Sequence, residues 1–200
     1  MRPTYWDAIR NRRTYYEIGN EQVTSDRRIE EIVNEAVKHV PSSFNSQSAR
    51  VVVLLGKQHE RLWELTKEEL GKILPAERAA ATWAKIDSAF RGGYGSVLFF
   101  EDGAVIESLR EQFPLYREKF PVWSQHSSGM LQFAVWTALE AQGWGASLQH
   151  YNPVIDRAVR EAWGIDPEWE LVAQMPFGKP LAQPAPKEYR PLAERVRLYR

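Results

Sequence analysis

The segment from Ser127 to Gln142 carries apolar side chains around most of the helix that its spacing predicts. Little polar face remains among Met130, Leu131, Phe133, Ala134, Val135, Trp136, Ala138 and Leu139. A helix that is apolar on most sides is stable in water only when other elements cover it. One small layer does not give that cover, so the fold must place this helix deep in its structure.

Several apolar runs predict the strands of a sheet. Val51–Leu55 is continuous and valine-rich, which is typical of a strand buried on both faces. Ser96–Phe100 predicts a second buried strand and Glu170–Met175 the last one, while Ala146–His150 has the length of a short strand. These runs indicate one sheet built from distant parts of the chain.

Helical spacing separates the predicted strands. It is found at positions 4–10, 26–40, 57–70, 76–90 and 104–112. Asn152 and Pro153 predict a cap and a first-turn proline for a helix that reaches Trp163. We therefore expect a single α+β domain over residues 1–200, with the sheet between helical layers.

The composition excludes several classes of function. Basic and acidic residues balance at 26 each, so no global field draws the protein to nucleic acid or to an anionic membrane. The absence of cysteine excludes disulfides, thiolate metal sites and cysteine nucleophiles, and the histidines show no metal-ligand spacing. No apolar stretch approaches the ~20 residues that cross a bilayer. We expect a cytoplasmic protein without a metal, a membrane or nucleic acid as partner.

Two segments do not fit regular elements. Phe113–Gln125 reads as an irregular aromatic lid, and candidates for lining a substrate there are Phe113, Tyr116, Phe120 and Trp123. The alternative is that these rings fill the core. The tail from Pro176 to Arg200 is rich in proline and basic residues, so we expect it to be extended and laid over a surface.

A basic triplet follows the first predicted helix. Arg12 and Arg13 provide charged donors and Thr14 a neutral one, which together suit a phosphate monoester. The alternative is a solvated basic turn.

A polar loop, Pro41-Ser42-Ser43-Phe44-Asn45-Ser46-Gln47, lies between a predicted helix and a predicted core strand. Its hydroxyls and amides are neutral donors and acceptors, as the ring edge of a flavin requires. The alternative is a turn whose serines and asparagine satisfy the end of the helix.

Taken together, the triplet and the loop resemble the nitroreductase family, whose signature pairs a basic-basic-hydroxyl triplet with a Pro-Ser-Ser-x-Asn-x-Gln loop. The similarity extends to the apolar central helix, to the turn Gly143-Trp144-Gly145 and to the basic tail after Gly178-Lys179-Pro180. The length and the Gln149-His150-Tyr151 segment look like the compact subgroup of fungi and bacteria. The resemblance implies a nitroreductase-like fold, with a central mixed sheet flanked by helices, and a homodimer.

The resemblance also implies roles for particular residues. Those that would bind FMN are Arg12, Arg13, Thr14, Ser42, Ser43, Asn45, Gln47, Gln149, His150, Lys187 and Arg190. The triplet and the tail residues stand where the family holds the phosphate. The loop stands where the family contacts the ribityl chain and ring from the other subunit. The apolar central helix would then form the core of the dimer.

The chain departs from the family pattern at two positions. Tyr16 stands where many relatives carry a basic residue near flavin N1 and O2, so negative charge there needs another partner. Gln149-His150 stands where many relatives have Glu-Gly, close to flavin N5.

The function that the resemblance implies is electron transfer from NADH or NADPH to small electrophiles such as nitroaromatics or quinones. FMN would carry the chemistry in a ping-pong cycle, without an obligatory catalytic side chain. The alternative is an FMN-binding regulatory or storage protein of the same fold with little turnover.

Overall fold

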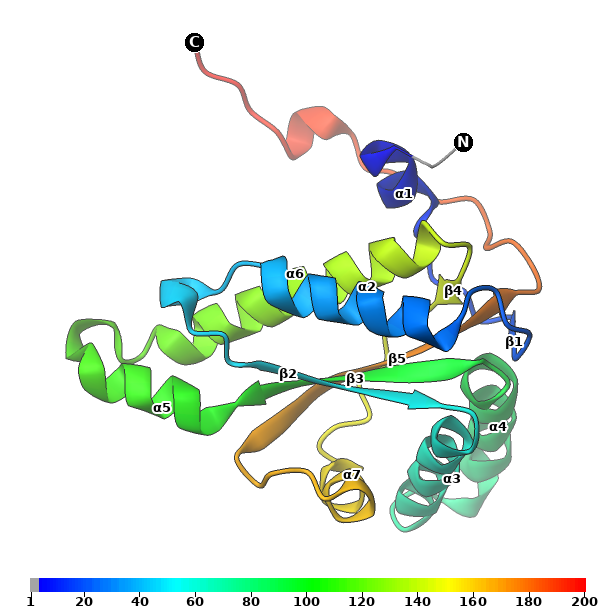
Figure 1. Ribbon diagram of the computed structural model, residues 1–200. Coiled ribbons are helices and arrows are strands. Elements are labelled where there is room, and N and C mark those ends of the chain that lie inside the picture. The colour runs from blue at the N-terminus through cyan, green and yellow to red at the C-terminus, as the bar shows by residue number, and fades with distance from the viewer. Residues whose placement is uncertain (1–3) are drawn as a thin grey trace.

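A sheet separates two helical layers in the computed structural model, which describes residues 4–200 (Figure 1). Across the sheet, the strands run in the order β1 (Ile18–Gly19), β5 (Trp169–Pro180), β3 (Gly95–Asp102) and β2 (Ala49–Leu55), while β4 (Gly145–Ala146) pairs with β5. These strand pairs are all antiparallel. The expected mixed character rests, within the described residues, on one parallel bridge between Thr14 and Ala146.

One face of the sheet is covered by α2 (Asp26–His39) and α6 (Phe120–Glu140) (Figure 1). Their shared core includes Ile29, Ile32, Val33, Val97, Phe99, Leu131, Val135, Leu139, Ala173, Met175 and Phe177. The central helix is thus placed as its apolar pattern predicts. Met130 and Phe133 on α6 nevertheless remain 44% and 39% exposed, so one subunit leaves part of this apolar helix uncovered.

The opposite face is covered by α3 (Lys57–Gly71), α4 (Ala76–Ile86) and α7 (Asp156–Trp163) (Figure 1). A π-helical turn, η2 (Asp87–Arg91), continues α4. The core on this side includes Leu54, Leu62, Trp63, Leu70, Ile86, Phe90, Leu98, Phe100, Ile155, Val159 and Leu171. Successive residues of β3 serve the two cores alternately, because side chains on a strand alternate between faces.

The prediction that Val51–Leu55 is buried on both faces was wrong. This run lies in β2, which is an edge strand of the sheet, and only Leu54 in that strand is fully buried. A valine-rich run shows that a strand is apolar but does not show which position it takes in the sheet.

The segment predicted as an irregular lid is largely helical. Phe113 ends α5 (Gly103–Gln112), a short turn η3 (Pro114–Tyr116) follows, and α6 begins at Phe120. Pro121 stands in the first turn of α6, where a proline is tolerated because the missing N–H has no helical partner. The prediction for this segment was therefore wrong from Phe120 onward.

The prediction that Asn152 caps the last helix was also wrong. The residues from 152 to 155 form turns and α7 begins at Asp156. Asn152 Oδ1 instead accepts from Gln174 Nε2 at 3.4 Å, so the side chain serves a contact with β5.

The carboxyl-terminal tail begins at Leu181, because β5 extends to Pro180. Its first residues lie against the segment after α1 (Tyr5–Asn11), where the Leu181 N–H donates to Glu17 O at 2.8 Å. Beyond Lys187 the tail, including the turn η4 (Leu192–Glu194), is exposed and leads away from the sheet (Figure 1). The expectation of a tail laid over a surface is therefore met only in its first part. No helix in the part of the chain that the structure describes is long and apolar enough to cross a membrane.

Candidate functional site

The basic triplet and the polar loop lie at opposite ends of α6. Figure 1 shows α1 beside the carboxyl-terminal end of this helix, whereas the loop after α2, which holds the short turn η1 (Ser43–Asn45), lies beside its beginning. The guanidinium of Arg12 is 4.4 Å from the ring centroid of Trp136, and the Phe44 ring is 6.2 Å from that of Trp123. These two tryptophans are about 20 Å apart along the helix axis. Within one subunit, the two predicted halves of the site do not meet.

Arg13, Thr14 and Lys187 line a cavity of about 510 Å³ between the triplet and the tail. Backbone contacts hold its walls, since the Tyr15 N–H donates to Ala146 O at 3.0 Å. Arg13 Nη2 donates to Ala185 O at 2.6 Å and so joins the tail to the triplet. Two cationic side chains and a hydroxyl around one cavity match the donors that a phosphate needs.

Arg12 faces α6 instead of this cavity. Its guanidinium stacks on Trp136 at 4.4 Å, and its Nε is buried without a hydrogen-bond partner among the described residues. Burial raises the pKa of Glu140 to about 7, and Arg12 opposes that rise. An unpartnered N–H on a half-buried cation is a costly arrangement that an anion would relieve.

The polar loop holds an unusual backbone conformation. Phe44, Asn45 and Gln47 have φ angles of 58°, 51° and 50°, in the left-handed region. Each such residue costs about 1–3 kcal/mol and persists only where its surroundings hold it. Here the Gln47 N–H donates to Ser42 Oγ at 3.0 Å, and Arg50 Nη1 donates to Gln47 O at 2.8 Å. These contacts therefore hold the loop in one conformation.

The loop side chains have different tasks. The Ser42 hydroxyl holds the loop from inside, as the turn interpretation of this segment expects. The amides of Asn45 and Gln47 are exposed, and with Ser42 they line a cavity of about 470 Å³. Ser43 does not line that cavity. Gln47 Nε2 donates only a long hydrogen bond to Asn45 O, at 3.5 Å, so these two exposed amides still leave donors and acceptors for a ligand.

An aromatic cluster surrounds Phe44. Its ring lies 4.8 Å from Phe113, 5.3 Å from Phe120, 5.9 Å from Tyr116 and 6.2 Å from Trp123. Phe120 is only 2% exposed, so the core-filling interpretation applies to it, whereas Tyr116 is 40% exposed. The polar loop and the aromatic residues thus form one surface. The sequence alone does not indicate this role of Phe44, because its aromatic neighbours lie about 70 residues further along the chain.

Gln149 is buried, whereas His150 and Arg190 are exposed, and their predicted contacts with a flavin stay predictions. The Gln149 N–H donates to Gln174 O at 2.7 Å and its Nε2 to Ser147 Oγ at 3.0 Å, so donors of this side chain and its backbone are used inside the chain. His150 is exposed. Arg190 is exposed in the tail and does not line the cavity of Arg13.

Tyr16, at the position where the resemblance implies a basic residue, has a cation beside it. Lys85 Nζ lies 5.7 Å from the centroid of the Tyr16 ring and 5.6 Å from that of Phe90. Helix α4 supplies this charge from a distant part of the sequence.

The nitroreductase family model matches residues 9–179. This chain belongs to the nitroreductase family. The predicted resemblance and the nitroreductase-like α+β fold are therefore confirmed.

Relatives cover nearly the whole of this nitroreductase-family chain. CinD of Lactococcus lactis, a nitroreductase solved with chloramphenicol and with 4-nitrophenol, is 39% identical; the match covers 98% of this chain and 100% of CinD, with a TM-score of 0.89. The nitroreductase FRM2 of Saccharomyces cerevisiae is 35% identical over 193 residues, which are 94% of this chain and 95% of FRM2. A protein from Desulfovibrio desulfuricans solved with FMN is 22% identical over 100% of this chain and 99% of its own, and its TM-score of 0.68 shows a shared fold.

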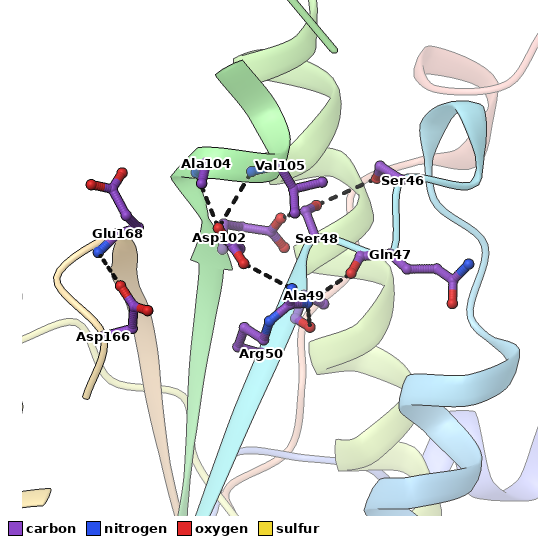
Figure 2. A network of polar contacts seen from close by, with 11 residues as sticks. Ser46, Gln47, Ser48, Ala49, Arg50, Asp102, Ala104, Val105, Asp166 and Glu168 are labelled. Carbon is purple, nitrogen blue, oxygen red and sulfur yellow. Dashed lines mark hydrogen bonds and ion pairs between the residues drawn. The ribbon is translucent and has the colours of Figure 1, made fainter. Parts of the chain in front are cut away.

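A polar network lies under the loop of this nitroreductase-family chain (Figure 2). Arg50 Nη2 pairs with Asp102 Oδ2 at 2.8 Å, and Asp102 Oδ1 accepts from the N–H groups of Ala104 and Val105 at the start of α5. The Asp102 N–H donates to Ser48 O at 2.9 Å. This network was not predicted, although the two acidic residues directly after the apolar run Ser96–Phe100 are a signal for it in the sequence.

Proposed function

We propose that this chain forms a homodimer that binds FMN between its subunits and transfers electrons from NADH or NADPH to small electrophiles in a ping-pong cycle. The observation that carries the proposal is the separation of two complementary half-sites at opposite ends of α6. A two-fold axis across α6 would bring the cavity of Arg13 in one subunit toward the Asn45 loop of the other. Each dimer would then contain two complete sites.

The exposed apolar surface supports the dimer. Met130 and Phe133 are exposed on α6, and the tail beyond Lys187 carries Leu192, Val196, Leu198 and Tyr199 with little contact to its own chain. Covering apolar side chains of this kind with a partner removes them from water and so stabilises the complex.

The residues present fit FMN. Arg13, Thr14 and Lys187 offer charged and neutral donors to its phosphate. Asn45 and Gln47 offer exposed amides to its ring edge. When bound, FMN supplies the two-electron chemistry that no side chain here provides. The protein's part is to hold it, to set the charge around it and to shape its open face.

The aromatic surface beside the loop supports a flat electrophile as substrate. Phe44 and Tyr116 are partly exposed next to Asn45. Chloramphenicol and 4-nitrophenol, the ligands of CinD, both carry a nitro group on an aromatic ring. We infer that nitroaromatics and quinones are the acceptors. The cytoplasmic location stays a prediction.

The first experiment is an absorbance spectrum of the purified protein beside gel filtration, with anaerobic addition of NADH and then NADPH. The proposal expects a yellow dimer that is bleached by at least one nicotinamide and recoloured by 4-nitrophenol or a quinone. A colourless monomer that cannot be reconstituted with FMN would overturn it. A yellow dimer that neither nicotinamide bleaches would favour the FMN-binding protein with little turnover, for which the internally bonded Gln149 is the supporting observation.

A further inference from the structure

A buried carboxyl group lies beside the end of the polar loop. Glu101 on β3 is fully buried, and its Oε2 is 2.6 Å from the Ser48 hydroxyl, which donates to it. Its other oxygen, Oε1, is buried without a hydrogen-bond partner among the described residues. A buried oxygen without a hydrogen-bond partner costs much less free energy on a neutral carboxylic acid than on a charged carboxylate.

Among the described residues, no cation forms an ion pair with Glu101. Arg50 is paired with Asp102 and donates to the carbonyls of Gln47 and Ala49. Glu170 on β5 is the strand partner of Glu101 and adds negative charge nearby. Burial raises the pKa of Glu101 to about 7; Ser48 and Arg50 oppose the rise, while Glu170 and Asp102 add to it.

Ser48 connects this carboxyl group to the loop. It follows Gln47 directly, and its backbone carbonyl accepts from the Asp102 N–H at 2.9 Å. Ser46 Oγ and Ser48 Oγ are 3.4 Å apart, so the hydroxyl contacts continue into the loop. The left-handed residues of the loop need such outside contacts to keep their shape.

We propose that Glu101 is a positioning residue, whose neutral form fixes the exit of the loop through Ser48 and so holds Asn45 and Gln47 ready for the flavin. Loss of the Glu101 proton leaves a buried carboxylate whose partner among the described residues is the Ser48 hydroxyl alone, and the cost of burying that charge favours a looser, more solvated loop exit. This inference rests on the proposed function, because it assigns the loop to the flavin of the other subunit.

The sign of the pH dependence follows from the raised pKa. A carboxyl group whose pKa is raised in the ordered state stabilises that state at pH values below its ordinary pKa of 4.5. This stabilisation is lost as the pH rises through the raised pKa of about 7. We therefore expect the wild-type protein to bind FMN less tightly at pH 8 than at pH 5.5. Glu101→Gln keeps a neutral side chain at every pH and should abolish that part of the dependence.

The test measures FMN affinity by flavin fluorescence from pH 5.5 to 8 for the wild type and Glu101→Gln. Phosphate ionisation affects both proteins equally, so the ratio of their dissociation constants isolates Glu101. We expect the ratio of wild-type to variant Kd to rise roughly tenfold across this range. Glu161→Gln on the exposed face of α7 is the matched control and should follow the wild type. Parallel curves for the wild type and Glu101→Gln would overturn the proposal.

A second readout needs no flavin. The N–H groups of Asn45, Ser46 and Gln47 are hydrogen-bonded within the loop, so their hydrogen exchange reports its order. At pH 5.5 these amides should exchange at the same rate in the wild type and in Glu101→Gln. At pH 8 they should exchange several-fold faster in the wild type than in the variant. If the two proteins exchange at equal rates at both pH values, the proposed role of Glu101 is overturned. If the exchange in the loop depends on pH in this way but FMN never binds, the proposed function fails, whereas the role of Glu101 in holding the loop stands.

Discussion

Arg12, Arg13 and Thr14 are neighbours in sequence, yet the two arginines enter different environments. Arg12 stacks on Trp136, whereas Arg13 reaches the tail and lines a cavity with Thr14 and Lys187. A guanidinium that already donates to a backbone carbonyl is fixed in place and loses little freedom when it binds an anion. Of the two arginines, Arg13 is therefore the fixed cation in the cavity that we propose for the FMN phosphate.

Arg13→Ala should weaken FMN binding roughly 10- to 150-fold, because a hydrogen bond to a charged group contributes about 1.5–3 kcal/mol. The measurement is fluorescence titration of the apoprotein with FMN. Arg10→Ala is the control, since Arg10 is exposed and pairs only with Asp7 among the described residues. An Arg13→Ala affinity within twofold of the wild type would contradict this assignment.

Lys85 should supply the charge that Tyr16 lacks. Its Nζ is 5.7 Å from the Tyr16 ring, and Tyr16 lines the same cavity as Arg13, Thr14 and Lys187. Lys85→Met should lower the midpoint potential of bound FMN by on the order of 20 mV, because a cation favours the more negative, reduced state. Anaerobic titration with a reference dye measures this potential. Lys72→Met, whose lysine pairs with Glu69 on the exposed end of α3, should leave the potential unchanged.

At the scale of elements, the junction between η3 and α6 performs two tasks at once. Phe120 is buried against Phe44 and Phe113, whereas the turn before the helix leaves Tyr116 partly exposed. One aromatic cluster therefore supports the strained loop from inside and presents a surface to a ligand outside.

Two substitutions separate these tasks. Phe120→Ala should lower the free energy of unfolding by about 3–5 kcal/mol, as is typical when a buried phenylalanine is lost. Tyr116→Ala should change that free energy by less than about 1 kcal/mol but raise the KM for 4-nitrophenol. Denaturant unfolding and steady-state kinetics provide the two measurements. If Tyr116→Ala leaves the KM unchanged, the surface beside Phe44 does not contact the substrate.

At the scale of the whole molecule, α6 links the two half-sites and keeps them apart. A helix of this length sets a separation that one subunit cannot close by moving a loop. Oligomerisation is therefore the step that would complete the site, and any change that separates the subunits should also release the cofactor.

Met130→Asp should dissociate the dimer, because a two-fold interface would bury the new carboxylate twice. We expect the dimer dissociation constant to rise at least about tenfold and the yellow colour to be lost with it. Sedimentation velocity over a range of concentrations, recorded at the flavin absorbance, follows both. Ile73→Asp, at an exposed position after α3, is the control. A Met130→Asp dimer that retains FMN would show that α6 is not the interface.

The sequence by itself determined the features that depend on near neighbours. Helical spacing from Asp26 to His39, the apolar run of β3 and the polar loop after Pro41 are local patterns, and each formed the element or turn that its spacing predicted. The family signature is local as well, since seven consecutive residues of the loop carry its more specific half.

Only the tertiary structure decided which of these residues meet. It placed β2 at the edge of the sheet, buried Phe120 while exposing Tyr116, turned Arg12 onto Trp136 and set Glu101 against Ser48. Each of these outcomes depends on contacts between residues far apart in the chain, and their free energies are set by burial and by the available partners. A local pattern records the chemistry of a side chain, whereas the packed fold determines what that side chain touches.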